Sequence, residues 1–223
     1  MEKSDEENEN EEELIASGFD RGVDFDSMKE KFIKEYEKVV NELQELSSED
    51  KYYKSKKKKL MNKMIYLLIA MIDLRNGSRI SEACNGFKSF LDNDDFETKV
   101  IVKIAKSKCK KYKRKTGESY ITKARYRRIT FPSNWIEIYL VKDLKYYFNK
   151  IPFEKLMKRV LDFLLLNFNC NTHSLRYAFI NHMIYDLGKD SNIIAKFVGH
   201  VNSNQITRYT QQKNVEKMFN EDI

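Results

Sequence analysis

The chain has 223 residues, and its 41 Lys and Arg outnumber its 34 Asp and Glu, for a net charge of +7. Residues 1–50 hold 18 acids and 6 bases (net −12), so residues 51–223 hold 16 acids and 35 bases (net +19). A body this basic favours a polyanionic partner, most simply nucleic acid. Three cysteines without close spacing exclude a disulfide framework or a CxxC metal site, and the acidic first residues exclude a signal peptide.

The predicted elements are mostly helical. Residues 1–25 form an acidic leader that we expect to be disordered, and 26–54 form a short helical segment and linker with apolar residues at helical spacing over 26–46. A lysine-rich link at 51–59 leads into an apolar helix over 60–74, which ends at Asn76-Gly77. The longest apolar run, 64–72, is too short to cross a membrane.

Beyond Gly77 the pattern predicts one small antiparallel sheet and then more helices. A short helical piece at 81–87 is followed by three strands, at 87–91, 98–105 and 120–131. The remaining helices are expected at 135–149, 153–168, 174–187 and 190–197, with short pieces near 203–210 and 214–220. The predicted fold class is therefore α+β, mainly helical, with a small three-stranded antiparallel sheet.

Five pieces of sequence carry chemistry, in a fixed order. They are Gly77-Ser-Arg79-Ile-Ser-Glu82, a lysine at the end of the second strand, His173-Ser-Leu-Arg176, Gly199-His200, and Tyr209 nine residues later. Here the sequence resembles the tyrosine recombinases, or phage integrase family, whose signature is G-x-R-x-x-E, a hairpin lysine, H-x-x-R, G-H and then a tyrosine. Each piece alone is weak, but the ordered set is specific and covers roughly residues 55–215.

The resemblance implies a catalytic domain at 55–223, including a C-terminal tail, and a role for each matched residue. Arg79 and Arg176 would clamp the non-bridging oxygens of a DNA phosphate, because guanidinium groups bind them bidentately and stay charged. His173 and His200 would donate hydrogen bonds to the same oxygens and move protons. Tyr209 would be the nucleophile and form a covalent 3′-phosphotyrosine, without a metal or another cofactor. Glu82 is read as structural, holding Arg79 or capping a helix.

The general acid for the leaving 5′-oxygen is the least settled residue. Lys103, Lys106 and Lys108 all lie near the end of the second strand, and the spacing from Arg79 favours Lys106. The hairpin that follows is long, and residues 106–128 carry 11 bases and one acid. We interpret it as a DNA-binding ribbon, with a disordered charged loop as the alternative. The predicted contacts are Lys108, Lys110, Lys111, Lys113, Arg114, Lys115, Arg125, Arg127 and Arg128.

Two further departures from the family pattern concern the residue after Arg176 and the segment before the matched region. Tyr177 follows Arg176 where many relatives have a histidine, and only 50 acidic residues precede the body where most members carry a DNA-clamping domain. The chain is thus expected to be either a fragment or a small protein that lacks the clamp. We expect the acidic leader to be either a solvated tail or a DNA mimic that occupies the basic face. The C-terminal segment around Val215 and Phe219 is expected either to dock on a neighbouring subunit or to cap its own subunit.

The predicted function is a DNA recombinase or integrase of the cytoplasm or nucleoid, encoded by a virus or plasmid. Its partners would be double-stranded DNA and further copies of itself, as a dimer or tetramer on DNA, and no membrane. A type IB topoisomerase, a telomere resolvase and a tyrosine transposase share the catalytic set and are the alternatives. A DNA-binding protein without catalysis is the alternative from another class.

Overall fold

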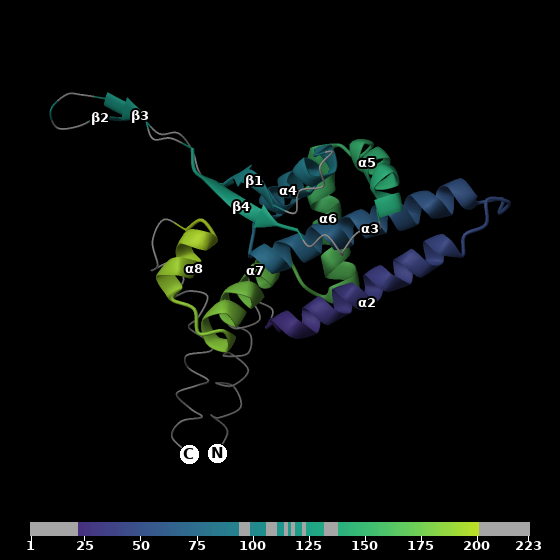
Figure 1. The fold of residues 1–223 in the computed structure, drawn as a ribbon, viewed down its shortest axis with the longest axis horizontal. Coiled ribbons are helices and arrows are strands. Elements are labelled where there is room, and N and C mark those ends of the chain that lie inside the picture. Colours follow the sequence, from purple (N-terminus) through teal and green to yellow (C-terminus); the bar gives the residue numbers. More distant parts are fainter. Residues whose placement is uncertain are drawn as a thin grey trace, which may run out of the picture.

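The structure is a computed structural model, and it describes residues 22–93, 99–105, 111–113, 116, 119–121, 124–131 and 138–200. The predicted class is confirmed, because the described part of the chain is mainly helical with short antiparallel strands (Figure 1). The leader up to residue 21 and the predicted helical pieces beyond residue 200 lie outside the described residues.

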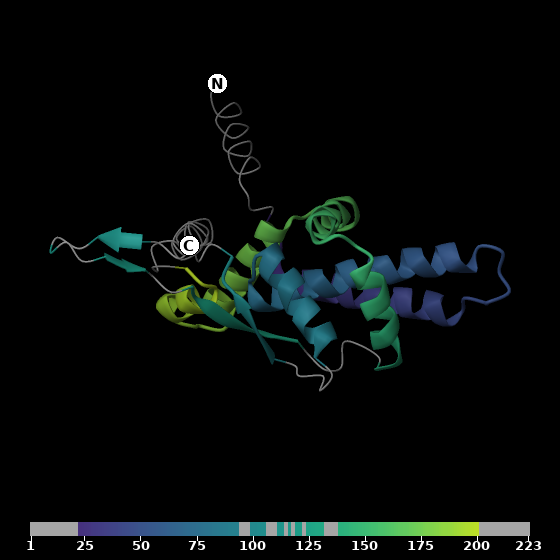
Figure 2. The same cartoon turned by 90° about the horizontal axis from the view of Figure 1, so that it is seen from above.

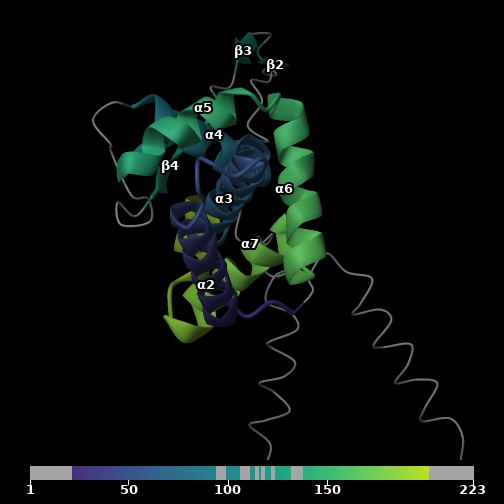
Figure 3. The same cartoon turned by 90° about the vertical axis from the view of Figure 1, so that its right-hand side faces the viewer.

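The centre of the fold is the long helix α3 (Tyr53–Asn76), and its buried residues explain why. From Met64 to Leu74 every side chain of α3 except Tyr66 is buried, on all sides of the helix. A helix that is apolar all round requires neighbours on every face. Those neighbours are α2 (Phe25–Gln44), α4 (Ile80–Asp92), α5 (Val141–Asn149), α6 (Phe153–Phe168) and α7 (Thr172–Asn181). Figure 3, which looks along the long axis, shows α3 enclosed by them.

The ends of α3 separate a correct prediction from a wrong one. Gly77 terminates the helix in a left-handed conformation, with φ of 51°, as the Asn-Gly signal predicts. The lysine-rich link at 51–59 was predicted wrongly, since α3 already begins at Tyr53. Lysine is a good helix former, and Lys57 is held by Asp143 of α5 at 2.7 Å while Lys56 is held by Asp50 at 2.5 Å.

The predicted strand at 87–91 is also wrong, because this segment is the second half of α4. Its buried residues recur every three or four positions, at Ala83, Cys84, Phe87, Phe90 and Leu91, which is a helical period. The apolar cluster at 87–91 is therefore one face of a helix that packs on α3.

The strands form two ladders of two rather than one sheet of three. Strand β1 (Lys99–Lys103) pairs antiparallel with β4 (Tyr126–Thr130), with Lys103 opposite Tyr126 and Ile101 opposite Arg128. Strand β2 (Lys111–Lys113) pairs with β3 (Ser119–Ile121). The predicted second strand is thus β1, and the predicted third strand is divided between β3 and β4. Figures 1 and 2 show β2 and β3 extending away from the helices.

The C-terminal half of the described chain continues as predicted, with α6, α7 and α8 (Ser191–Phe197) and two shorter turns. A 3-10 turn over Ile138–Leu140 precedes α5, and a π-helical turn over His182–Asp186 extends α7. Asn171 caps α7, its side chain accepting the Ser174 N–H at 2.9 Å. Helix α7 packs against α3 at the end where Gly77 lies, and Figure 1 shows α8 next to α7 there.

Candidate active site

The turn from α3 to α4, which carries Arg79, is held by close packing and by backbone hydrogen bonds. A Cβ placed on Gly77 would lie 2.3 Å from Cδ1 of Phe179 in α7, so only glycine permits this approach. The backbone carbonyl of Asp73 accepts the N–H of Gly77 and that of Ser78, the latter at 3.2 Å. These contacts fix the position from which Arg79, the N-cap residue of α4, projects.

Glu82 is the acid around which the turn and the strands meet. Its side chain is 0% exposed and accepts a hydrogen bond from Arg79 Nη1 at 3.2 Å and from Arg127 Nη1 at 3.3 Å. It also accepts the backbone N–H of Ala105, just beyond β1, at 3.0 Å. The structural role predicted for Glu82 is therefore confirmed, and its partners on β4 and beyond β1 are additional to that prediction.

Arg127 departs from its predicted role as a phosphate contact on the surface. It is 7% exposed, its guanidinium pairs with Glu82, and its Cζ lies 5.0 Å from the ring centroid of Phe197. Burial lowers the pKa of Arg127 to about 10, against the raising effect of Glu82. The alternation of β4 explains the difference, because Arg127 and Ile129 face inward while Tyr126 and Arg128 face solvent.

Arg176 joins two parts of the motif that are far apart in sequence. It is 1% exposed, with Nη1 donating to the Gly77 carbonyl at 2.5 Å and Nη2 donating to the Val198 carbonyl at 2.8 Å. The first carbonyl lies two residues before Arg79 and the second lies two residues before His200. We name the cluster formed by Asp73, Arg79, Glu82, Arg127 and Arg176 the arginine junction.

Gly199 and His200 lie against the end of β1. Gly199 has a φ of 78°, and a Cβ there would lie 3.1 Å from Cδ1 of Ile104. Arg125, just before β4, reaches both residues, with Nη2 3.5 Å from the Gly199 carbonyl and Nη1 3.4 Å from the His200 carbonyl. His200 is 6% exposed. Thus Arg125, predicted as a DNA contact, also ties the strands to the Gly-His turn.

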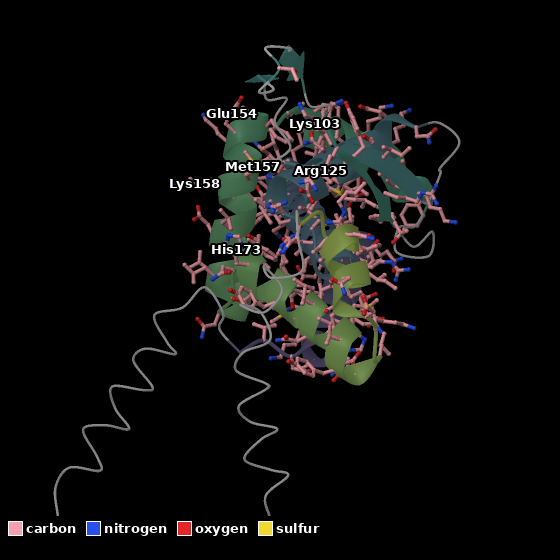
Figure 4. All side chains as sticks on the ribbon, turned by 90° about the vertical axis from the view of Figure 1, so that its left-hand side faces the viewer. Lys103, Arg125, Glu154, Met157, Lys158 and His173 are labelled. Atoms are coloured by element: carbon pink, nitrogen blue, oxygen red, sulfur yellow. The ribbon has the colours of Figure 1, made fainter. Side chains whose placement is uncertain are left out.

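His173 lies near the start of α7, one helical turn before Arg176, and is exposed. Figure 4 shows His173, Arg125 and Lys103 presented on one side of the molecule, together with Glu154, Met157 and Lys158 of α6. Lys103 is the last residue of β1 and is exposed with Tyr126 and Arg128. We name the outward row of Lys99, Ile101, Lys103, Tyr126 and Arg128 the ribbon face.

Asp73 is the residue of the junction that sequence reasoning missed. Its side chain is fully buried, and Oδ1 accepts the Ser78 hydroxyl at 3.3 Å. Burial raises the pKa of Asp73 well above its usual value, and the charge of Arg176 opposes that shift. The available signal was an acid at the end of the apolar run 64–72, within a helix that is buried on all sides.

Several predicted site residues lie outside the described residues, so the structure does not place them. These are Lys106, Lys108, Lys110, Arg114, Lys115 and Tyr209. Lys111 and Lys113 are the ends of β2. Within the described ranges no group of three His, Cys, Asp or Glu side chains is arranged to hold a metal ion, and none of the helices described there has the length and apolarity to cross a membrane.

Comparison with known proteins identifies relatives of this chain. A Sputnik virophage protein named "Putative integrase V10" is 41% identical over 213 residues, which cover 94% of this chain and 92% of that protein. The chain belongs to the same integrase family. An Acidianus two-tailed virus protein named "Putative integrase ORF241" is 31% identical over 166 residues, covering 72% of this chain and 57% of that protein.

An archaeal relative is also found for this integrase family member. An uncharacterized protein of Methanocaldococcus jannaschii is 29% identical over 212 residues, covering 87% of this chain and 84% of that protein. No family model matches the chain. The two relatives that carry integrase names are both viral proteins.

Proposed function

We propose that this integrase family member is a site-specific tyrosine recombinase, which cleaves and rejoins double-stranded DNA through Tyr209. The observation that carries the proposal is the pair of hydrogen bonds from Arg176 to the carbonyls of Gly77 and Val198. Through them the H-x-x-R piece touches the G-x-R-x-x-E turn, 99 residues away, and the segment that leads into Gly-His. Convergence of distant motif pieces is expected of a catalytic site, whereas a chance match gives no reason for it.

The proposed mechanism assigns a charge or a proton to each residue. Arg79 and Arg176 stabilise the negative charge that gathers on the non-bridging oxygens as the phosphorus becomes pentacoordinate. His200 and His173 donate to the same oxygens, and His173 receives the proton of the Tyr209 hydroxyl. The Tyr209 oxygen then bonds to phosphorus while the bond from phosphorus to the 5′-oxygen breaks.

The leaving 5′-oxygen takes a proton from a hairpin lysine. Lys106 is the favoured donor, with Lys103 and Lys108 as the other candidates, and Lys103 is exposed at the end of β1. The product is a 3′-phosphotyrosine and a free 5′-hydroxyl. Because the phosphodiester energy is retained in the covalent bond, attack by another 5′-hydroxyl reverses the chemistry and joins a new pair of strands.

We propose that DNA lies along the side that presents the ribbon face, Arg125 and His173. Figure 4 shows Lys103 on this side. Lys99, Lys103 and Arg128 of the ribbon face are exposed and would contact phosphates. The protein would act as a dimer or tetramer on DNA, because strand exchange requires two duplexes. Expression from a viral genome fits the viral relatives with integrase names.

The decisive experiment is the capture of the covalent intermediate. The full chain is incubated with nicked duplexes made from DNA that flanks its gene, and a protein–DNA adduct is sought on a denaturing gel. We expect wild type to form the adduct and Tyr209→Phe to lose it completely, since no oxygen remains to attack. Tyr52→Phe, which alters an exposed tyrosine before α3, should retain it.

The outcomes separate the proposal from its alternatives. If wild type forms no adduct on any duplex, the chain is a DNA-binding protein without catalysis and the proposal is wrong. If an adduct forms, recombination between two sites supports the recombinase. Relaxation of a supercoiled plasmid without exchange would instead indicate a topoisomerase.

A further inference from the structure

Arg127 is the side chain of β4 that enters the arginine junction, and three other elements meet on it. Its Nη1 donates to Glu82 Oε2 at 3.3 Å, and its Nη2 donates to the Asn76 carbonyl at 2.5 Å. Its Cζ lies 5.0 Å from the ring centroid of Phe197 in α8. The guanidinium is therefore held by α4, by the end of α3 and by α8 at the same time.

The contact with Glu82 leads directly to the first arginine of the proposed phosphate clamp. Glu82 Oε1 accepts Arg79 Nη1 at 3.2 Å. Oε2, the oxygen that Arg127 holds, also accepts the backbone N–H of Arg79 at 3.4 Å. Because Arg127 and Arg79 share one carboxylate, the direction of the Glu82 side chain, and with it that of Arg79, depends on Arg127.

The contact with Asn76 leads to the second clamp arginine. The Asn76 carbonyl directly precedes Gly77, whose own carbonyl accepts Arg176 Nη1 at 2.5 Å. The Asn76 side chain bonds the backbone of Thr130, accepting its N–H at 3.0 Å and donating to its carbonyl at 3.0 Å. Arg127 and Thr130 thus fasten β4 to the end of α3 at two points, beside the carbonyl that receives Arg176.

Stability alone does not account for an arginine at this position. Arg127 is 7% exposed, and a buried ion pair adds little net stability over a well-packed apolar residue of similar size. What arginine adds is a rigid planar fork, which fixes two acceptors in direction, whereas lysine provides a point charge. The fork is cationic at neutral pH, since burial lowers the pKa of Arg127 only to about 10.

We propose that Arg127 is a positioning residue for DNA cleavage, which orients the two clamp arginines without touching DNA itself. It orients Arg79 through Glu82, and it orients Arg176 through the turn at the end of α3. This inference rests on the proposed function, in which the clamp stabilises the charge that gathers on the phosphate. A displacement of about 1 Å can reduce a rate about a hundredfold, so loss of the fork should slow cleavage and leave DNA binding intact.

The first measurement is the rate constant of adduct formation by the full chain when all of the nicked duplex is bound. In single-turnover kinetics a displaced clamp lowers the rate constant, whereas a fraction of unfolded protein lowers only the amplitude. Arg127→Lys keeps the positive charge but cannot bond both acceptors as a fork, and it should lower the rate constant by about tenfold or more. Arg159→Lys, the same change at an exposed position of α6, should leave it unchanged.

The second measurement is DNA affinity, with Tyr209→Phe present to prevent cleavage. Anisotropy of the fluorescently labelled nicked duplex is recorded at several salt concentrations. Arg127→Gln should keep the affinity and the salt slope of the protein with Arg127. Arg128→Gln, the neighbour that faces solvent, should bind more weakly and with a slope shallower by about 0.9. Urea unfolding checks that each variant is folded at the assay temperature.

The outcomes decide between a positioning role, a charge and a DNA contact. A wild-type rate constant in Arg127→Lys would show that charge alone suffices and would overturn the inference. A shallower salt slope in Arg127→Gln would also overturn it, because Arg127 would then contact phosphate. If Arg127→Gln does not fold, the rate constant of Arg127→Lys decides alone. Absence of any adduct from wild type sinks the recombinase proposal and this inference with it, whereas equal rate constants for wild type and Arg127→Lys sink this inference only.

Discussion

In the arginine junction, Arg127 and Arg176 are 7% and 1% exposed, and the charges of Asp73 and Glu82 act on them. On the ribbon face, Lys103 and Arg128 belong to the same β1–β4 ladder as Arg127, but their side chains are exposed. Removing a guanidinium from water is costly unless acids and carbonyls replace its hydration, so the donors of the junction have set positions. Exposed cations carry little intramolecular energy and keep their charge available for DNA. In the proposed function, the arginine junction supplies geometry and the ribbon face supplies attraction for DNA.

The largest expected effect comes from neutralising the acid at the centre of the junction. Glu82→Gln leaves Arg79 and the buried Arg127 without the counter-charge that they share, and the Glu82 side chain itself is fully buried. We expect a loss of about 3–5 kcal/mol in the free energy of unfolding. Urea unfolding followed by circular dichroism measures it.

A matched acid on the surface of the same helix serves as the control for Glu82. Asp92→Asn removes the exposed ion pair with Lys88, also within α4, and should change the free energy of unfolding by no more than about 0.5 kcal/mol. Equal small losses for both variants would show that Glu82 is not the counter-charge on which the junction depends.

The next effect concerns the backbone beside the junction. Gly77→Ala places a methyl group where the gap to Phe179 is 2.3 Å, and it forces alanine to adopt a φ of 51°. Gly188→Ala has a similar φ of 60° with no atom within 4 Å of the new Cβ. The left-handed strain alone should cost about 1–2 kcal/mol at both positions. The clash should add about 1–3 kcal/mol at Gly77 alone.

The two glycine variants also separate stability from catalysis. Gly77→Ala should reduce adduct formation, because the turn that it displaces carries Arg79 and receives Arg176. Gly188→Ala should leave adduct formation unchanged at temperatures where it is folded. Similar unfolding midpoints for the two variants would contradict the close approach of α3 and α7.

Much of the fold follows from local sequence signals. The helix stop at Gly77 and the helices from α5 to α8 were predictable, because glycine at a helix end and apolar residues at helical spacing act locally. The strand predicted at 87–91 failed because five residues, of which only Phe87, Phe90 and Leu91 are apolar, are too few to fix a period when read in isolation. Only the continuation from Ala83 and Cys84 shows that the period is helical.

The site was predictable as a list of residues but not as an arrangement. Spacing indicated Arg79, His173, Arg176 and His200, whereas the burial of Arg127 and the position of Asp73 under the turn depend on contacts between distant elements. Composition counted Arg125, Arg127 and Arg128 alike as basic. Strand alternation assigns Arg127 to the interior and Arg128 to the ribbon face.

The smallest effect on stability, and the sharpest test of the ribbon face, is the double variant Lys103→Ala/Arg128→Ala. Both side chains are exposed, so the free energy of unfolding should change by less than about 0.5 kcal/mol. Each phosphate contact releases counterions, so the slope of log affinity against log salt should become shallower by about 0.9 for each side chain that touches DNA.

The charge-matched control is Lys51→Ala/Lys54→Ala, at the opposite end of α3, which at 24 residues is about 36 Å long. If the two variants show the same salt slope, net charge rather than the ribbon face determines DNA binding. If the salt slope changes only in Lys103→Ala/Arg128→Ala, the duplex lies beside β1 and β4, the strands whose inward-facing side includes Arg127 of the junction.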